Sequence, residues 1–416
     1  MSKIIRVHAR EILDSRGKPT VEAEVHLDDG TVGRASVPSG ASTGAAEACE
    51  LRDRDPLWYL GLGVRGAVRN VIEGLGPALQ GSDVANQAAI DQRMIELDGT
   101  PTKSRLGANA ILSVSLATAR AAANARRVPL YRQIAELAGT TVRMPVPMTN
   151  MISGGAHAYG NLDFQDVLVI PVGAPDYPTA LEWIVRVYRK LGRNLLDYDY
   201  EGYLVGDEGG YGPRLKSNRH AIEFVERSIR TAQLEPGRDM RIALDVAATH
   251  FFTRNAKYDL RLDGAEYSME QMVDFLESLA EEFPIASIED GLNEFDWSGW
   301  QRLTSRLGER VMLVGDDLFA TNEKRLQRGI DEKVGNAILI KVNQIGTLTE
   351  TFRTMLLARQ HGYTCIVSAR SGETEDDFLA DLAVGTAADY IKIGGVARSE
   401  RLAKYNRLLR IAEELE

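Results

Sequence analysis

The feature that most constrains the fold is a regular alternation of short apolar segments and helical patterns in the later part of the chain. After an apolar segment at residues 242–246, others begin at residues 286, 312, 337, 365 and 390, and helical spacing of apolar residues fills each gap. Strands that alternate with helices pair in parallel through crossover connections. A solenoid could show the same spacing, but these segments share no common motif. The pattern therefore predicts a closed (β/α)8-type barrel rather than a short open sheet.

The beginning of the chain has a different pattern. Val21, Ala23, Val25 and Leu27 alternate with polar residues and predict a half-buried strand, which a turn at residues 28–30 connects to a second strand at residues 31–37. From residue 68 to about residue 128 the apolar spacing becomes helical. A chain of 416 residues exceeds what one core usually needs. We therefore expect an α+β capping domain over residues 1–135, followed by a catalytic barrel over residues 140–416.

Charge and cysteine content exclude several classes of protein. The formal net charge is −10, which disfavours a nucleic-acid partner. Cys49 and Cys365 are far apart and form neither a zinc motif nor a disulfide framework. No apolar stretch approaches the length that crosses a bilayer, and the first residues lack a signal-peptide pattern. We expect a cytoplasmic protein that acts without a membrane.

Charged side chains follow successive predicted strands at the point where each strand ends. The C-terminal strand ends of a barrel meet at one mouth, where barrel enzymes carry their catalytic residues. One such charge would mean little, since a charged residue after a strand is usually solvated. A run of them predicts an active site, with a structural ion-pair network as the alternative. In chain order they are Asp245, Glu289, Asp290, Asp316, Asp317, Lys341, Arg370 and Lys392.

The types of these residues indicate the chemistry. Carboxylates without a histidine or cysteine motif are hard oxygen ligands, which suit Mg²⁺ better than zinc. Lys341, Arg370 and Lys392 would face this metal and favour a doubly anionic substrate, with Arg370 and Ser371 on a phosphate. A lysine that other cations and a metal surround loses its proton more readily, so it can act as a base.

Two glycine-rich loops and one strand add further candidates. Glu208 lies in the loop at residues 205–213 and is a candidate general acid, although a simple turn would look similar. His157 lies in the glycine loop at residues 154–158, where a surface histidine is an equally good interpretation. Asp166 opens an apolar segment at residues 165–171, which we interpret as a strand.

With these motifs in place, the sequence resembles the enolase (phosphopyruvate hydratase) family over essentially its whole length. The resemblance implies an N-terminal α+β lid domain and a (β/α)8 barrel whose first elements run ββαα. It also implies a homodimer or homo-octamer that acts on a small phosphorylated or phosphonate carboxylic acid. The matching stretches are residues 9–17, 37–44, 206–210, 287–290, 315–318, 341–346, 370–376 and 398–406.

The resemblance also implies roles for individual residues. It assigns one Mg²⁺ to Asp245, Glu289 and Asp316, and a second Mg²⁺, which arrives with substrate, in part to Ser42. Lys341 would remove the C2 proton of 2-phosphoglycerate, and Glu208 would protonate the departing 3-hydroxyl. The remaining contacts would be the substrate carboxylate for Lys392, the phosphate for Arg370 and Ser371, and the leaving-group side for His157.

Several positions depart from the family pattern. Asp166 stands where the family has a glutamate that works alongside the acid Glu208. Ala369 stands where the family has a histidine near the phosphate and the second metal. Lesser departures are Ser153 for asparagine, His250 for glutamate and the stretch at residues 393–395. Because the metal-binding carboxylates, Lys341 and Glu208 are intact, we expect a working enzyme rather than a non-catalytic binding protein. It is either an enolase or a specialised paralogue, such as a carboxyphosphonoenolpyruvate synthase that uses an activated phosphonoformate donor.

Overall fold

The computed structural model describes residues 2–40 and 44–416 of the chain. Its N-terminal part is a three-stranded antiparallel sheet in the order β1-β2-β3, formed by Ile4–Leu13, Pro19–Leu27 and Val32–Ser36. The alternating pattern at Val21 to Leu27 had predicted β2, and β1 pairs with it along its length. Because alternate side chains of a strand point to one face, Val21, Ala23 and Val25 are all buried.

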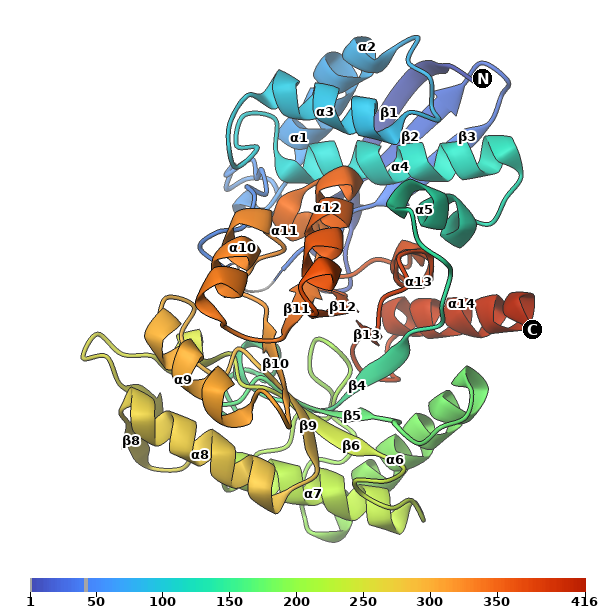
Figure 1. The fold of residues 1–416 in the computed structure, drawn as a ribbon. Coiled ribbons are helices and arrows are strands. Elements are labelled where there is room, and N and C mark those ends of the chain that lie inside the picture. The colour runs from blue at the N-terminus through green and yellow to red at the C-terminus, as the bar shows by residue number, and fades with distance from the viewer. Residues whose placement is uncertain (1, 41–43) are drawn as a thin grey trace.

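Helices cover the buried face of this sheet. The alanine-rich α4 packs against β2 and β3, and it is buried along nearly its whole length because small side chains permit close approach. In Figure 1 this sheet and its helices form a cap at one end of the barrel. The helical elements of this part are η1 (Tyr59–Gly61), α1 (Arg65–Arg69), η2 (Asn70–Leu75), α2 (Gly76–Leu79), α3 (Gln87–Asp98), α4 (Ala108–Arg126) and α5 (Leu130–Ala138).

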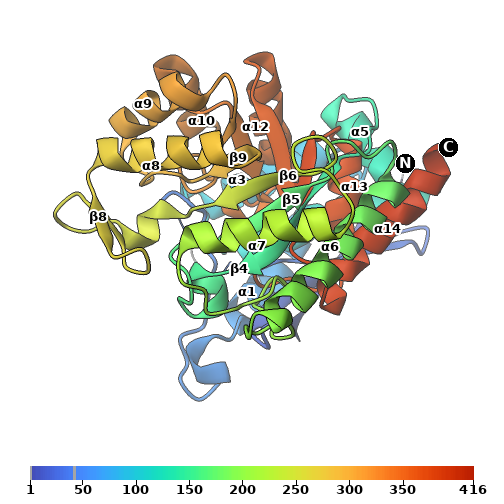
Figure 2. The ribbon, with the colours of Figure 1, turned by 90° about the horizontal axis from the view of Figure 1, so that it is seen from below.

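The rest of the chain forms a closed eight-stranded barrel, as predicted. Its strands follow the order β4-β5-β6-β9-β10-β11-β12-β13, and β13 pairs with β4 to close the ring. Helices surround the strands, as Figure 2 shows. The strands are β4 (Val146–Ser153), β5 (Asp166–Ile170), β6 (Arg241–Asp245), β9 (Ile285–Glu289), β10 (Met312–Gly315), β11 (Ala337–Ile340), β12 (Thr364–Ser368) and β13 (Tyr390–Lys392).

The barrel opens with the ββαα order that the resemblance implied. β4 and β5 are followed by α6 (Tyr177–Asp197) and α7 (Asn218–Thr231) before β6 begins. β5 runs antiparallel to both of its neighbours, whereas the other pairs are parallel. The first residue of β5 therefore lies at the rim where the other strands end, and Asp166 is the direct pairing partner of Asp245.

The later connections are mostly single helices. A small hairpin of β7 (Tyr258–Leu260) and β8 (Ala265–Tyr267) interrupts the connection after β6. The helices are α8 (Met269–Glu282), α9 (Trp297–Leu307), α10 (Glu323–Glu332), α12 (Leu348–Gln360), α13 (Phe378–Gly385) and α14 (Ser399–Leu415), and the short turns are η3 (Gly155–Ala158), η4 (Ala248–Phe251) and α11 (Val342–Ile345).

One predicted strand is shorter than expected. The apolar segment that begins at residue 337 continues to Val342 and predicts a strand of that length, but β11 ends at Ile340 and Val342 opens the turn α11. The cause is tertiary: the backbone N–H of Lys341 donates to the hydroxyl of Thr321 instead of a neighbouring strand. Lys341 is thereby placed at the barrel mouth, one residue beyond the sheet.

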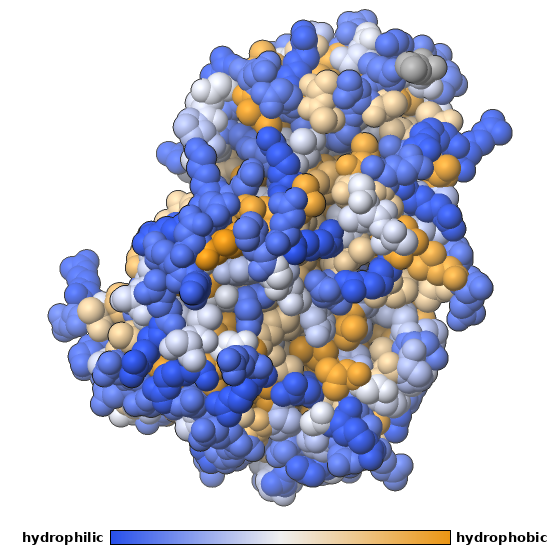
Figure 3. Space-filling model, in the orientation of Figure 1, coloured by the Kyte–Doolittle hydropathy of each residue, from blue (hydrophilic) through white to orange (hydrophobic). Residues whose placement is uncertain are grey.

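Apolar side chains fill the barrel below that mouth. Met148, Leu168, Val314, Leu339 and Ile366 belong to one buried cluster in the barrel, which leaves the polar strand ends above it. Hydrophilic residues prevail on much of the outer face shown in Figure 3. Among the described residues, no helix is both long and apolar enough to pass through a membrane.

Candidate active site

Lys392 lies at the centre of the polar mouth. Its Nζ is 2.7 Å from Asp245 Oδ2 and 2.8 Å from each carboxylate oxygen of Glu289. Gln165 Nε2 also donates to Asp245 Oδ2 at 3.2 Å. Lys392, Asp245 and Glu289 are all buried, because each ends a strand of the closed barrel. Residues that are far apart in sequence thus form one compact ion-pair group.

A second ion pair lies beside the first. Lys341 Nζ contacts Asp316 Oδ2, and Gln344 Nε2 donates to the other oxygen of Asp316 at 2.9 Å. Gln344 reaches Asp316 because α11 turns the chain back immediately after Lys341. Gln344 was not among our predicted site residues, although it lies in the stretch 341–346 that matches the family.

The electrostatics of the mouth fit a bound cation. In the described part of the chain, the lysines that pair with the three buried carboxylates Asp245, Glu289 and Asp316 are Lys341 and Lys392. Burial and the neighbouring Asp245 raise the pKa of Glu289 well above its ordinary value. Burial opposes the charge of Lys341, but Asp316 outweighs it and raises the pKa of this lysine. A hard cation with oxygen ligands would offset the excess negative charge, and this donor set suits Mg²⁺.

A neighbouring acidic group has a different role. Carboxylate oxygens of Asp290, Asp316 and Asp317 lie within 4.8 Å of one another. However, the two oxygens of Asp290 accept the backbone N–H groups of Asp316 at 3.0 Å and of Asp317 at 2.8 Å. Asp290 thus fixes the turn after β10 and orients Asp316. Asp245, Glu289 and Asp316 do not form such a group among the described residues, so their assignment to one Mg²⁺ stays a prediction.

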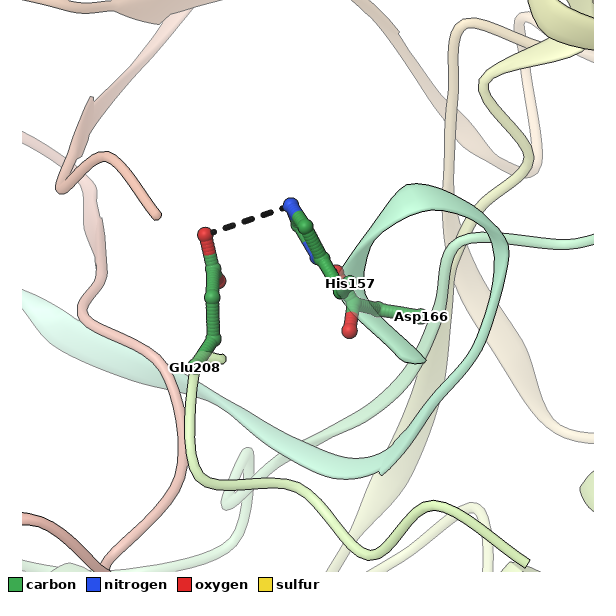
Figure 4. Close-up of side chains that lie close together, drawn as sticks. All are labelled: His157, Asp166 and Glu208. Atoms are coloured by element: carbon green, nitrogen blue, oxygen red, sulfur yellow. Dashed lines mark hydrogen bonds and ion pairs between the residues drawn. The ribbon is translucent and has the colours of Figure 1, made fainter. Parts of the chain in front are cut away.

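On another side of the mouth, His157 lies between two carboxylates (Figure 4). Its Nδ1 is 2.9 Å from Asp166 Oδ2, and its Nε2 is 3.5 Å from Glu208 Oε1. Asn150 Nδ2 donates to the other oxygen of Glu208 at 3.2 Å. All four side chains are buried, and these distances show that His157, Asp166 and Glu208 lie together.

The proton of this group resides on the histidine. Burial would lower the pKa of His157, but Glu208 and Asp166 outweigh it and raise the pKa to about 9. Burial would raise the pKa of Glu208, yet the charges of His157 and Arg401 bring it below its ordinary value. Burial raises the pKa of Asp166 as well, but we place the proton on the ring because both of its nitrogens face carboxylates.

The loop that carries Glu208 is held by close backbone packing. Gly209 has a φ of +86°, and a Cβ there would lie 2.7 Å from the carbonyl oxygen of Ala397. The carbonyl of Glu208 accepts the N–H of Gly395 at 2.7 Å. The departure at residues 393–395 therefore lies directly against the loop of the proposed acid.

The predicted phosphate side is built around Arg370. Its Nη1 is 3.0 Å from Glu47 Oε2 and donates to Asn343 Oδ1 at 2.9 Å. The buried guanidinium of Arg401 holds this segment by donating to the carbonyls of Arg370 and Ser371 at 2.7 Å and 2.8 Å. Glu47 was missed in the sequence, because it lies in a loop of the N-terminal part with no strand pattern to place it.

The remaining predicted residues have different positions. Ala369 is buried, and its N–H donates to the carbonyl of Lys392 at 2.8 Å. Ser371 is buried beside Arg370. His250 is exposed in the turn η4 after β6. Ser42, which we assigned to a second Mg²⁺, lies outside the described residues.

Comparison with protein families agrees with this architecture. The family model for the N-terminal domain of enolase matches residues 4–134. The family model for the C-terminal TIM-barrel domain of enolase matches residues 141–416. Together the two matches cover nearly the whole chain, including both sides of the barrel mouth. The chain therefore belongs to the enolase family.

Proposed function

We propose that this enolase-superfamily enzyme removes the C2 proton of 2-phosphoglycerate, or of a close analogue, and forms an enolpyruvyl product. One observation carries the proposal: the mouth holds a lysine–carboxylate group and a separate histidine–carboxylate group. Removing a proton next to a carboxylate and expelling a hydroxyl requires both a base and an acid. Lys341 and the pair of His157 and Glu208 can supply these two functions.

Asp245, Glu289 and Asp316 would hold Mg²⁺ in this proposal. When bound, Mg²⁺ stabilises the negative charge that develops on the substrate carboxylate as the C2 proton leaves. Lys341 can accept that proton only as a free amine. Its contact with Asp316 now favours the charged form. Engagement of Asp316 by a cation would weaken that contact and release Lys341 for its role as base.

On the acid side, the 3-hydroxyl must receive a proton as it departs. Glu208 is the residue that we expected to deliver it, and His157 lies close enough to share a proton with Glu208. Lys392 would contact the substrate carboxylate. Arg370 and Ser371 would contact the phosphate, in which case the phosphate would compete with Glu47 for the guanidinium of Arg370.

Ala369 supports a second candidate, a synthase of the carboxyphosphonoenolpyruvate type. Its small side chain is buried between Arg370 and the end of β12, next to the proposed phosphate contacts. A family member with histidine there has an additional hydrogen-bond donor and a bulkier side chain. A specialised paralogue could use the space for an activated phosphonoformate donor.

Phosphorus NMR of the purified protein with Mg²⁺ and 2-phosphoglycerate tests the first proposal, and the same mixture with a phosphonoformate donor tests the second. Ala369→His should raise ordinary dehydration and suppress any reaction with the donor. Rapid dehydration by the unaltered protein, with no effect of Ala369→His, would indicate a plain enolase. No reaction in either mixture would instead favour a non-catalytic binding protein.

The resemblance, the net charge and the lack of a long apolar stretch in the sequence together suggest the remaining proposals. We propose a second Mg²⁺ per active site, a homodimer or homo-octamer, and a cytoplasmic location. We also propose that the protein acts on a small acid without a nucleic-acid or membrane partner. Mass photometry and metal titration would test the oligomer and the number of ions.

A further inference from the structure

Ser153 is a buried polar residue that the proposed function does not use. It is the last residue of β4, and its side chain has no exposure to solvent. Its hydroxyl donates to Asp166 Oδ1 at 3.0 Å. The other carboxylate oxygen of Asp166 is 2.9 Å from His157 Nδ1. Asp166 therefore has one oxygen on the serine and the other on the histidine.

The backbone around Ser153 is fixed on several sides. Its N–H donates to the carbonyl of Tyr211 at 2.8 Å, and its carbonyl accepts Asn161 Nδ2 at 3.1 Å. A Cβ on Gly210 would lie 2.6 Å from Ser153 Oγ, and one on Gly206 would lie 2.9 Å from Ser153 Cβ. Ser153 is thus packed against the loop that carries Glu208, with little freedom to move.

We infer that Ser153 is a positioning residue, whose hydroxyl holds the Asp166 carboxylate in the orientation that aligns the His157 ring with Glu208. A serine hydroxyl has a single proton to donate, and here that proton points to Asp166. Without it, the Asp166 carboxylate could rotate about its terminal bond, because among the described residues His157 would be its remaining side-chain hydrogen-bond partner. Ser153 and Asp166 both depart from the family pattern, and their direct contact means that the two departures act together.

The kinetic test of this positioning role rests on the proposed function, because it measures turnover of the proposed substrate. A small displacement of a catalytic group, about 1 Å, can cost about 100-fold in rate. We expect Ser153→Ala to lower kcat for dehydration about 10- to 100-fold with KM changed less than about threefold. Exchange of the C2 proton should continue, because Lys341 belongs to the other group at the mouth.

A double-mutant cycle separates positioning from general damage. If Ser153 acts through Asp166, Ser153→Ala should cost little further activity once Asp166→Asn is present. Ser113→Ala is the matched control, since Ser113 is also buried and its hydroxyl donates to the carbonyl of Ala110 in α4. We expect this control to keep kcat within about twofold. Additive losses in the cycle would overturn the inference.

A spectroscopic measurement tests the same geometry without turnover. The chain has six histidines, so a His157→Gln variant identifies the ring signals of His157 in a nitrogen–proton spectrum. We expect a hydrogen-bonded Nδ1–H signal of His157 that Ser153→Ala shifts or broadens and Ser113→Ala leaves unchanged. An unchanged signal in Ser153→Ala would refute the positioning role, even if the protein has no dehydratase activity. If the unaltered protein has no dehydratase activity but Ser153→Ala still shifts the signal, the result counts against the proposed function alone.

Discussion

The protonation of His157 gives the most direct test of the electrostatics at the barrel mouth. An ordinary histidine has a pKa of 6.5, whereas Glu208 and Asp166 raise that of His157 to about 9 despite its burial. The folded protein therefore binds this proton more tightly than the unfolded chain. We predict that His157 stays protonated at neutral pH and titrates only near pH 9.

The size of the effect on stability follows from the same two values. Since a tenfold change in proton affinity is worth about 1.4 kcal/mol, the difference between 6.5 and about 9 corresponds to about 3 kcal/mol. Because the pKa in the folded state is the higher one, this contribution is fully present below pH 6.5. It is lost as the pH rises from 6.5 to 9, and the free energy of unfolding should fall over that interval.

The assay is a pair of pH titrations in the presence of a chelator, which keeps the carboxylates at the mouth free of metal ions. Ring signals of His157, assigned with His157→Gln, report its pKa directly. Denaturant unfolding between pH 6 and pH 10 reports the free energy of unfolding of the unaltered protein and of the His157→Gln variant. Asp166→Asn should lower the pKa of His157, because it removes one of the two neighbouring negative charges.

A pKa of His157 at or below 6.5 would refute the reasoning, since burial would then outweigh the two carboxylates. The stability measurement has a separate criterion. The His157→Gln variant should lose the part of the pH dependence that lies between 6.5 and 9. An identical pH profile in both proteins would show that other groups cause the decline.

Three further predictions concern the other residues at the mouth. In a thermal-shift assay, Mg²⁺ should raise the melting temperature of the unaltered protein but not that of Asp316→Asn. An equal rise in the two proteins would exclude Asp316 as a ligand. Lys341→Ala should abolish exchange of the substrate C2 proton with solvent, whereas Glu208→Gln should permit exchange and block loss of the 3-hydroxyl. Equal loss of exchange in both variants would contradict the proposed roles of base and acid. Glu47→Gln should lower the apparent Kd for phosphate by calorimetry, because the substrate phosphate would no longer compete with a carboxylate for Arg370.

The periodic pattern of the sequence was sufficient to predict the barrel. The strand predicted to begin at residue 312 is β10, which begins at Met312, since each short buried strand is an apolar run between helices. The charged residues after the strands were also informative, because parallel strands bring their C-terminal ends to one rim. Asp245, Glu289 and Lys392 meet there for that reason.

Contacts between side chains that are distant in sequence could not be predicted from the periodic pattern. The sequence marked Asp166 as the start of a strand, but only the reversed direction of β5 places it opposite Asp245. Glu47 reaches Arg370 from a loop of the N-terminal part, and no local pattern anticipates that contact. The roles assigned to the site residues and the domain boundary near residues 135–140 stay predictions.

The sequence alone therefore determined the class of fold, most of the barrel strands and the kind of charge at the mouth, because these depend on local periodicity and residue type. Only the tertiary structure decided which charges pair. Lys341 forms an ion pair with Asp316, and His157 lies between Asp166 and Glu208 rather than at the surface. These pairings depend on barrel closure, which brings together side chains that are distant in sequence and excludes the water that would otherwise screen them.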